Sequence, residues 1–183
     1  MLMNQNLADE LVMMMREDQH MLQQLFDAGE LPAESYHPRM KALHEQNTAR
    51  LKEIISVHGW PGIPHVGEEA AKAAWLVAQH SVSDLDFMAE CAGLLEEAVA
   101  REEGAGWQLA FLQDRVRTLS GKPQVYGTQF DVDEKGWPTP FPIEDAATVN
   151  ERRVRLGLNS LEERQEQMVE QERKRRSNIE QTR

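Results

Sequence analysis

The sequence contains few of the residues that mark secreted, cysteine-ligated or membrane-spanning proteins. Cys91 is the only cysteine among 183 residues, which excludes an intramolecular disulfide and the cysteine-rich patterns of zinc fingers. No apolar run approaches the roughly 20 residues that a membrane-spanning helix needs. The first residues also lack the basic segment and small-residue cleavage site of a secretory signal. We therefore expect a cytoplasmic protein that does not interact with membranes.

Positive charge is also scarce, because 20 lysines and arginines face 31 aspartates and glutamates, for a net charge of −11. The first 150 residues hold 24 of the acidic and 11 of the basic residues, so the remaining 33 residues are mildly basic. An acidic body argues against a dedicated nucleic-acid-binding protein, which would carry a basic face. The run Arg173–Arg176 is flanked by glutamates and is typical of a solvated helix face. We expect a small anionic molecule as the partner, and homo-oligomerisation is left open.

Apolar residues recur at helical spacing along most of the chain, which predicts an all-α fold. Ser160 and Glu163 form a capping-box pattern, so a further helix begins there. We expect one irregular bundle of about six or seven helices over residues 1–158, followed by a solvated helix or tail over 159–183. A proline-rich loop or small hairpin at 121–145 interrupts the bundle, because its three closely spaced prolines forbid a central strand. The sequence predicts helices over 5–28, 33–58, 68–80, 84–103, 107–119 and 146–156.

Four of the predicted helices place a polar side chain within an apolar stripe. These side chains are Asp18, Asn47 (with His44 one turn earlier), His80 and Asp114. Burying a polar group is unfavourable by a few kcal/mol unless the group is paired, so each position needs an explanation. Two interpretations stay open: a buried network that fixes the helix register, or a pocket lined by convergent polar groups.

The pocket interpretation assigns acid–base chemistry to His80, since the ordinary pKa of histidine lies near neutrality. Asp114 or Asp18 would orient its imidazole. We expect the segment Gln124–Gln129 to pack over His80 and Asp114, so that one common site forms. None of the six histidines forms an HExxH motif, so we assign no metal ligands and expect no cofactor. The residues expected to bind substrate are Trp75, Gln79, Arg115, Gln124, Tyr126, Thr128, Gln129, Arg152 and Arg153.

An ordered series of short motifs runs through the chain to about residue 158. The motifs are REDQ (16–19), HGWPG (58–62), VGEEAAKAAWLVAQH (66–80), LQDRV (112–116), GKPQVYGTQF (121–130), PIED (142–145) and ERRVRLGL (151–158). Together they resemble a bacterial domain-of-unknown-function family, the one numbered sixty-six twenty-four. The family has no assigned activity, so the resemblance implies no reaction. It does imply that Asp18, His80, Asp114 and the expected substrate-binding residues other than Thr128 occupy motif positions.

Two function classes follow from these patterns. The first is a cytosolic enzyme, or enzyme-like small-molecule site, that uses His80 with Asp114 or Asp18 on an anionic substrate, with hydrolysis as the simplest reaction class. The second is a non-catalytic binding or partner-recognition protein, in which the acidic surface docks a basic partner.

Overall fold

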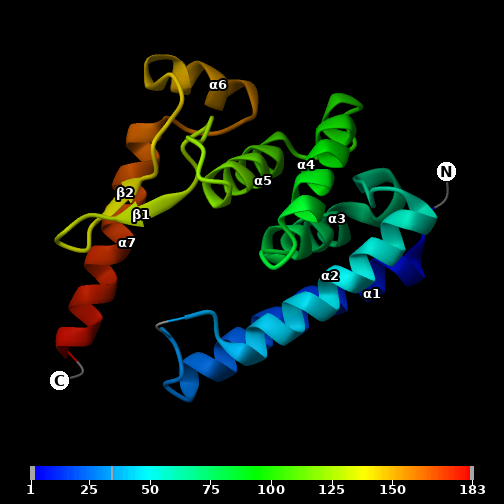
Figure 1. The fold of residues 1–183 in the computed structure, drawn as a ribbon, viewed down its shortest axis with the longest axis horizontal. Helices are drawn as coiled ribbons and strands as arrows, with labels where there is room; N and C mark the ends of the chain where they lie inside the picture. The colour runs from blue at the N-terminus through cyan, green and yellow to red at the C-terminus, as the bar shows by residue number, and fades with distance from the viewer. Residues whose placement is uncertain (1–2, 34, 182–183) are drawn as a thin grey trace. The chain divides into compact units, whose positions relative to one another are not determined.

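The computed structural model describes residues 3–33 and 35–181. In this part of the chain the fold is all-α, as the sequence predicts, with one small hairpin (Figure 1). None of the described helices is both long and apolar enough to cross a lipid bilayer. The helices are α1 (Gln5–Asp27), α2 (Pro38–His58), α3 (Ile63–His80), α4 (Leu85–Ala100), α5 (Gly106–Leu119), α6 (Val149–Arg155) and α7 (Leu161–Gln181).

The contacts within the chain divide it into two compact units, residues 1–108 and 109–183. The division falls inside α5. The sequence placed a boundary near residue 158, and that domain boundary stays a prediction. Each unit is described below by itself.

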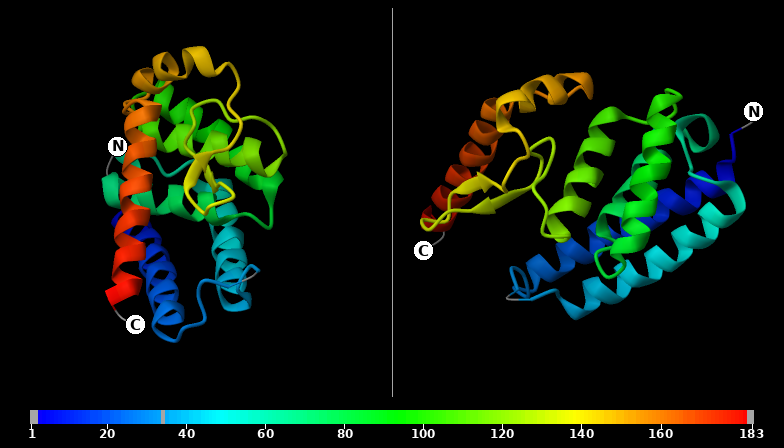
Figure 2. Two further views of the ribbon diagram at one scale, coloured as in Figure 1. Left: turned by 90° about the vertical axis from the view of Figure 1, so that its left-hand side faces the viewer. Right: turned by 45° about the horizontal axis from the view of Figure 1, so that its top comes forward.

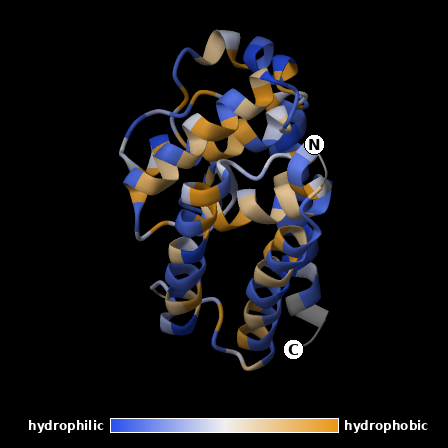
Figure 3. Ribbon diagram, turned by 90° about the vertical axis from the view of Figure 1, so that its right-hand side faces the viewer, coloured by the Kyte–Doolittle hydropathy of each residue, from blue (hydrophilic) through white to orange (hydrophobic). Residues whose placement is uncertain are grey.

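The first unit is built on two long helices that lie side by side, α1 and α2 (Figure 1). Leu11 and Leu25 of α1 and Leu51 of α2 are completely buried, while hydrophilic positions alternate with them along both ribbons (Figure 3). α3 packs against both helices. Its Ala73 and Ala74 are fully buried, and such small side chains let helix backbones approach closely.

Local sequence signals determine where several of these helices begin. The side chain of Asn4 accepts a hydrogen bond from the Leu7 amide (3.2 Å) at the start of α1. Asp84 caps α4 in the same way through the Phe87 amide (3.1 Å). These caps satisfy amide groups that lack a partner within the first helical turn.

The second unit contains the predicted excursion, which forms an antiparallel hairpin of β1 (Phe130–Val132) and β2 (Pro138–Pro140). Both strands are edges, which is where proline is tolerated in a sheet. A 3-10 turn, η1 (Ala146–Thr148), leads into α6, and β2 lies beside α7 (Figure 2). The capping box is confirmed, because the Glu163 amide donates to Ser160 Oγ (3.2 Å) and the Ser160 amide donates to Glu163 Oε2 (2.9 Å).

Candidate functional site

Three ionisable side chains from three helices meet in the first unit. Oδ2 of Asp18 lies 2.8 Å from Nδ1 of His80 and 2.7 Å from Nε2 of His44. The two imidazole rings are 4.4 Å apart between their centroids. The Asp18 side chain is 7% exposed and that of His44 is 10% exposed, whereas His80 is 28% exposed. We call Asp18, His44 and His80 the His–Asp cluster, in which His80 is the member most accessible to solvent.

Helix geometry and one hydrogen bond between two hydroxyl groups hold the three cluster residues in position. Asp18 lies on the buried face of α1, and His44 lies on α2 one turn before Thr48. The hydroxyl groups of Thr48 and Ser81 are buried and lie 2.8 Å apart, which holds α2 against the residue that follows His80. His80 is the last residue of α3, where the partial negative charge of the helix C-terminus stabilises a positive imidazole.

The hydroxyl group of Tyr36 extends the cluster by hydrogen bonding to Nδ1 of His44. A neutral His44 whose Nδ1 accepts a hydrogen bond from the phenol carries its own proton on Nε2, which faces Asp18. Asp18 accepts a hydrogen bond from Nδ1–H of His80, which leaves the lone pair of neutral His80 on Nε2. Nε2 of His44 lies 2.7 Å from the same oxygen, but its direction does not make a hydrogen bond with any of the described residues.

Asp18 remains a carboxylate in this arrangement. Burial, the largest single influence, acts to raise its pKa. The contacts with His44 and His80 together outweigh burial and hold the pKa of Asp18 well below its ordinary value.

The side chains of the His–Asp cluster also provide a set of ligand atoms that suits a metal ion. One ligand atom from each of Asp18, His44 and His80 can be chosen so that all lie within 4.8 Å of one another. Two imidazoles and one carboxylate are a set found around zinc and non-haem iron. This grouping could not be predicted from the sequence, because the three residues come from three separate helices.

Asp114 has a different set of partners, all in the second unit. Its carboxylate is fully buried and accepts hydrogen bonds from the amides of Val125 (2.7 Å), Tyr126 (3.0 Å) and Thr128 (2.9 Å), and from the Thr128 hydroxyl (2.9 Å). The sequence left Asp18 and Asp114 as alternatives for orienting His80. In the structure Asp18 contacts His80, and Asp114 holds the 124–128 loop.

The side chain of Gln124 also stabilises this loop. The side-chain nitrogen of Gln124 donates to the backbone carbonyl groups of Gln129 and Phe141 (2.9 Å each). Its side-chain oxygen accepts from the backbone amide of Gln129 (2.9 Å). The side-chain nitrogen of Gln129 donates to Thr128 Oγ1 (3.1 Å). The side-chain oxygen of Gln129 accepts from Arg115 at 3.5 Å. These expected substrate-binding groups therefore contact one another.

Both adjacent arginines of α6 are bound to backbone carbonyl groups. Arg152 donates to Val125 O (2.8 Å) and Glu144 O (2.6 Å). Arg153 is 1% exposed and donates to Tyr126 O (2.6 Å), Gly127 O (3.3 Å) and both oxygens of Asn159. The two guanidinium groups thus bind carbonyl groups of the 124–128 loop, while Asp114 binds amide groups of the same loop.

The remaining two expected residues lie on α3 in the first unit. Trp75 is buried, donates from Nε1 to the carbonyl group of Gln108 (2.9 Å) and packs edge-on against Trp107. Gln79 is buried and precedes His80. The expected site residues thus divide between the two units, with Asp18, Trp75, Gln79 and His80 in the first and the others in the second.

Comparison with known families adds one match. The profile of a family described as a family of unknown function, DUF6624, covers residues 5–173. The chain belongs to this family. No curated protein and no solved structure matches it. The motif resemblance is therefore confirmed, and membership of DUF6624 extends to α7, beyond the last motif that the sequence offered.

Sequence reasoning missed two members of the site. His44 was noted beside Asn47 but was not given a catalytic role, and Tyr36 falls within the helix predicted over 33–58 without any role. The available signal was the spacing of His44, Asn47 and Thr48, which places all three on one buried helix face. In the structure α2 begins at Pro38 rather than at residue 33, so Tyr36 meets His44 from the segment that precedes the helix.

Proposed function

We propose that this protein is a cytoplasmic enzyme whose His80 transfers a proton to and from a small anionic substrate, with hydrolysis as the simplest reaction class. The observation that carries the proposal is the 2.8 Å contact between Asp18 Oδ2 and His80 Nδ1, which leaves Nε2 of the more exposed imidazole available. A carboxylate that holds one ring nitrogen while the other meets substrate is the arrangement used in general acid–base catalysis.

In the proposed reaction Nε2 of His80 removes a proton from water or from a substrate hydroxyl group. The resulting imidazolium is stabilised by Asp18 and by the C-terminus of α3. The same nitrogen then returns the proton to the leaving group. His44 and Tyr36 act as positioning residues, because their contacts align the Asp18 carboxylate.

The test compares His80→Gln with His58→Gln, which removes an exposed imidazole from the end of α2. The substrates are nitrophenyl esters of acetate and phosphate, whose hydrolysis is visible. We expect His80→Gln to lower turnover by about 10²–10⁴-fold, the usual contribution of a general acid or base. His58→Gln should retain wild-type turnover. Equal turnover in the two variants contradicts the proposal and favours a non-catalytic binding role.

A metal centre is a second candidate, favoured by the convergence of the three ligand atoms within 4.8 Å. Here Asp18, His44 and His80 would hold a divalent transition metal that acts as a Lewis acid. Cobalt(II) gives a visible absorption band whose intensity reports its coordination. A band that is lost in His44→Gln, together with turnover that a chelator abolishes, supports the metal centre over proton transfer by His80.

A further inference from the structure

A second candidate site lies wholly within the second unit, where α6 and α7 meet one end of the 124–128 loop. It is a cavity of about 180 Å³. Two guanidinium groups line it, those of Arg153 and Arg164, together with the amides of Asn159 and Gln167. No carboxylate is among the described residues that line it. The lining is therefore cationic although the protein as a whole carries a net charge of −11.

The two arginines differ in how their charge is compensated. Arg153 is held by carbonyl groups and attracted by the carboxylates of Asp114 and Glu162. Its pKa is nevertheless lowered, first by burial and then by the charge of Arg164. The proximity of two like charges is unfavourable unless an anion lies between or beside them.

Arg164 has the less complete set of partners. Its Nε atom is buried, and none of the described residues accepts a hydrogen bond from it. A buried donor without an acceptor destabilises the protein by about 1–3 kcal/mol, more for a charged group. Guanidinium groups bind carboxylate and phosphate oxygens through paired N–H donors, so the two arginines that line the cavity favour an oxyanion there.

We infer that this cavity binds the carboxylate or phosphate group of a small molecule, with Arg164 as the main contact. Phe111 and Leu158 also line the cavity, so the ligand has a short apolar part next to its charged group. A volume of about 180 Å³ corresponds to about six water molecules at ~30 Å³ each, which is too small for a nucleotide. The inference is independent of the His–Asp cluster and extends the function beyond it.

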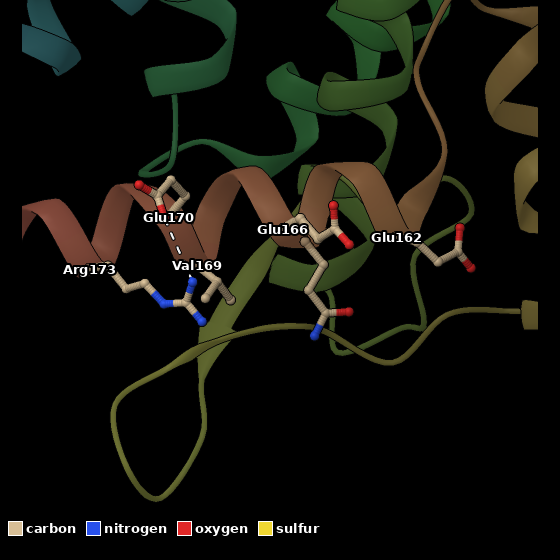
Figure 4. A pocket seen from close by; sticks show the side chains of 6 residues that line it. Glu162, Glu166, Val169, Glu170 and Arg173 are labelled. Atoms are coloured by element: carbon tan, nitrogen blue, oxygen red, sulfur yellow. Dashed lines mark ion pairs between the residues drawn. The ribbon is translucent and has the colours of Figure 1, made fainter.

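A larger hollow on α7 has the opposite character (Figure 4). Its volume is about 620 Å³, and Glu162, Glu166 and Glu170 line it, with Glu170 paired to Arg173 at 3.7 Å. The acidic residues recur every four positions along this face of α7. Arg164 and Gln167 lie on a different face, which the helical period separates from the acidic one. The charge of the small cavity is therefore a local feature of one helix face.

The test measures binding of two probes, inorganic phosphate and butyrate, to the full chain by calorimetry at constant ionic strength. Arg164→Gln removes the main contact, and Arg173→Gln makes the same change of charge on the acidic face of α7. We expect saturable binding of at least one probe, weakened about tenfold or more in Arg164→Gln and unchanged within about twofold in Arg173→Gln. The preferred probe identifies the oxyanion as phosphate or carboxylate.

A third variant keeps the test independent of folding defects. Gln167→Glu introduces a carboxylate at the mouth of the cavity and should compete for Arg164. We expect this variant to lose probe binding while its melting temperature stays equal to or above that of the wild type. The inference is overturned if neither probe binds saturably to the wild type, or if Arg173→Gln weakens binding as much as Arg164→Gln.

Discussion

Nδ1 of His80 lies 2.8 Å from Oδ2 of Asp18, and Nε2 of His44 lies 2.7 Å from the same oxygen. One buried carboxylate oxygen therefore faces two imidazoles from two other helices. If a residue of this kind served packing alone, a neutral side chain of equal size would replace it with little effect.

Asp18→Asn should reduce the free energy of unfolding by about 1–3 kcal/mol, because it keeps the volume and removes the charge that two imidazoles contact. The adjacent Glu17→Gln makes the same chemical change at an exposed position and should stay within about 0.5 kcal/mol of the wild type. Urea denaturation measures both. Equal effects would show that the Asp18 carboxylate contributes nothing specific.

The stabilisation by Asp18 should depend on pH in a definite direction. Its pKa is lower in the folded state than in the unfolded state, so the contribution is complete above the ordinary carboxyl pKa of about 4. It is lost as the pH falls further, towards the folded-state pKa. In metal-free protein, the difference in melting temperature between wild type and Asp18→Asn should therefore narrow below about pH 4. A difference that grows with acid would contradict the direction of the shift.

Asp114→Asn should release the 124–128 loop, because the carboxylate accepts hydrogen bonds from three backbone amides and one hydroxyl group. We expect a loss of stability of about 3 kcal/mol or more and faster hydrogen exchange at the amides of Val125, Tyr126 and Thr128. The exposed Glu134→Gln in the hairpin turn serves as the control. Unchanged exchange at these amides would argue that Asp114 does not hold the loop.

Gly127→Ala should be more destabilising than Gly121→Ala, although both glycines have positive φ angles of 68° and 70°. Both variants strain the backbone by roughly 1 kcal/mol. A Cβ atom at Gly127 would also lie 2.8 Å from Leu161 Cδ1 and 3.0 Å from Ile143 Cδ1, whereas at Gly121 it meets nothing within 4 Å. Thermal unfolding should therefore show that Gly127→Ala lowers stability by about 1 kcal/mol or more beyond the loss in Gly121→Ala, because of this overpacking.

Much of the fold could be predicted from the sequence because its signals are local. The helical period, the capping box at Ser160 and the prolines of the hairpin each act within a few residues of the chain. The buried positions of Asp18, His44 and Asp114 also follow from the period, since each shares a face with apolar residues. These signals set the elements and the direction in which each side chain points.

The pairing of the polar residues could not be predicted in the same way. Asp18 and Asp114 are both buried aspartates on apolar faces, and only the packing of the helices decides which one meets His80. The sequence identifies Arg153 as a substrate-binding residue, but it does not reveal that carbonyl groups of Tyr126 and Gly127 accept hydrogen bonds from its guanidinium group. The sequence did not identify Arg164 as a site residue, because its helix has the composition of a solvated helix and the cavity lies on only one of its faces.

The most direct test of the central claim is the tautomer of His80, measured by nitrogen-15 NMR on chelator-treated protein at about pH 8. We expect a proton on Nδ1 and a lone pair on Nε2, because Asp18 accepts a hydrogen bond from Nδ1. In Asp18→Asn this preference should weaken, and the proton should populate Nε2. A proton on Nε2 of His80 in the wild type, or an Nδ1–H tautomer that Asp18→Asn leaves unchanged, would contradict the role given to Asp18.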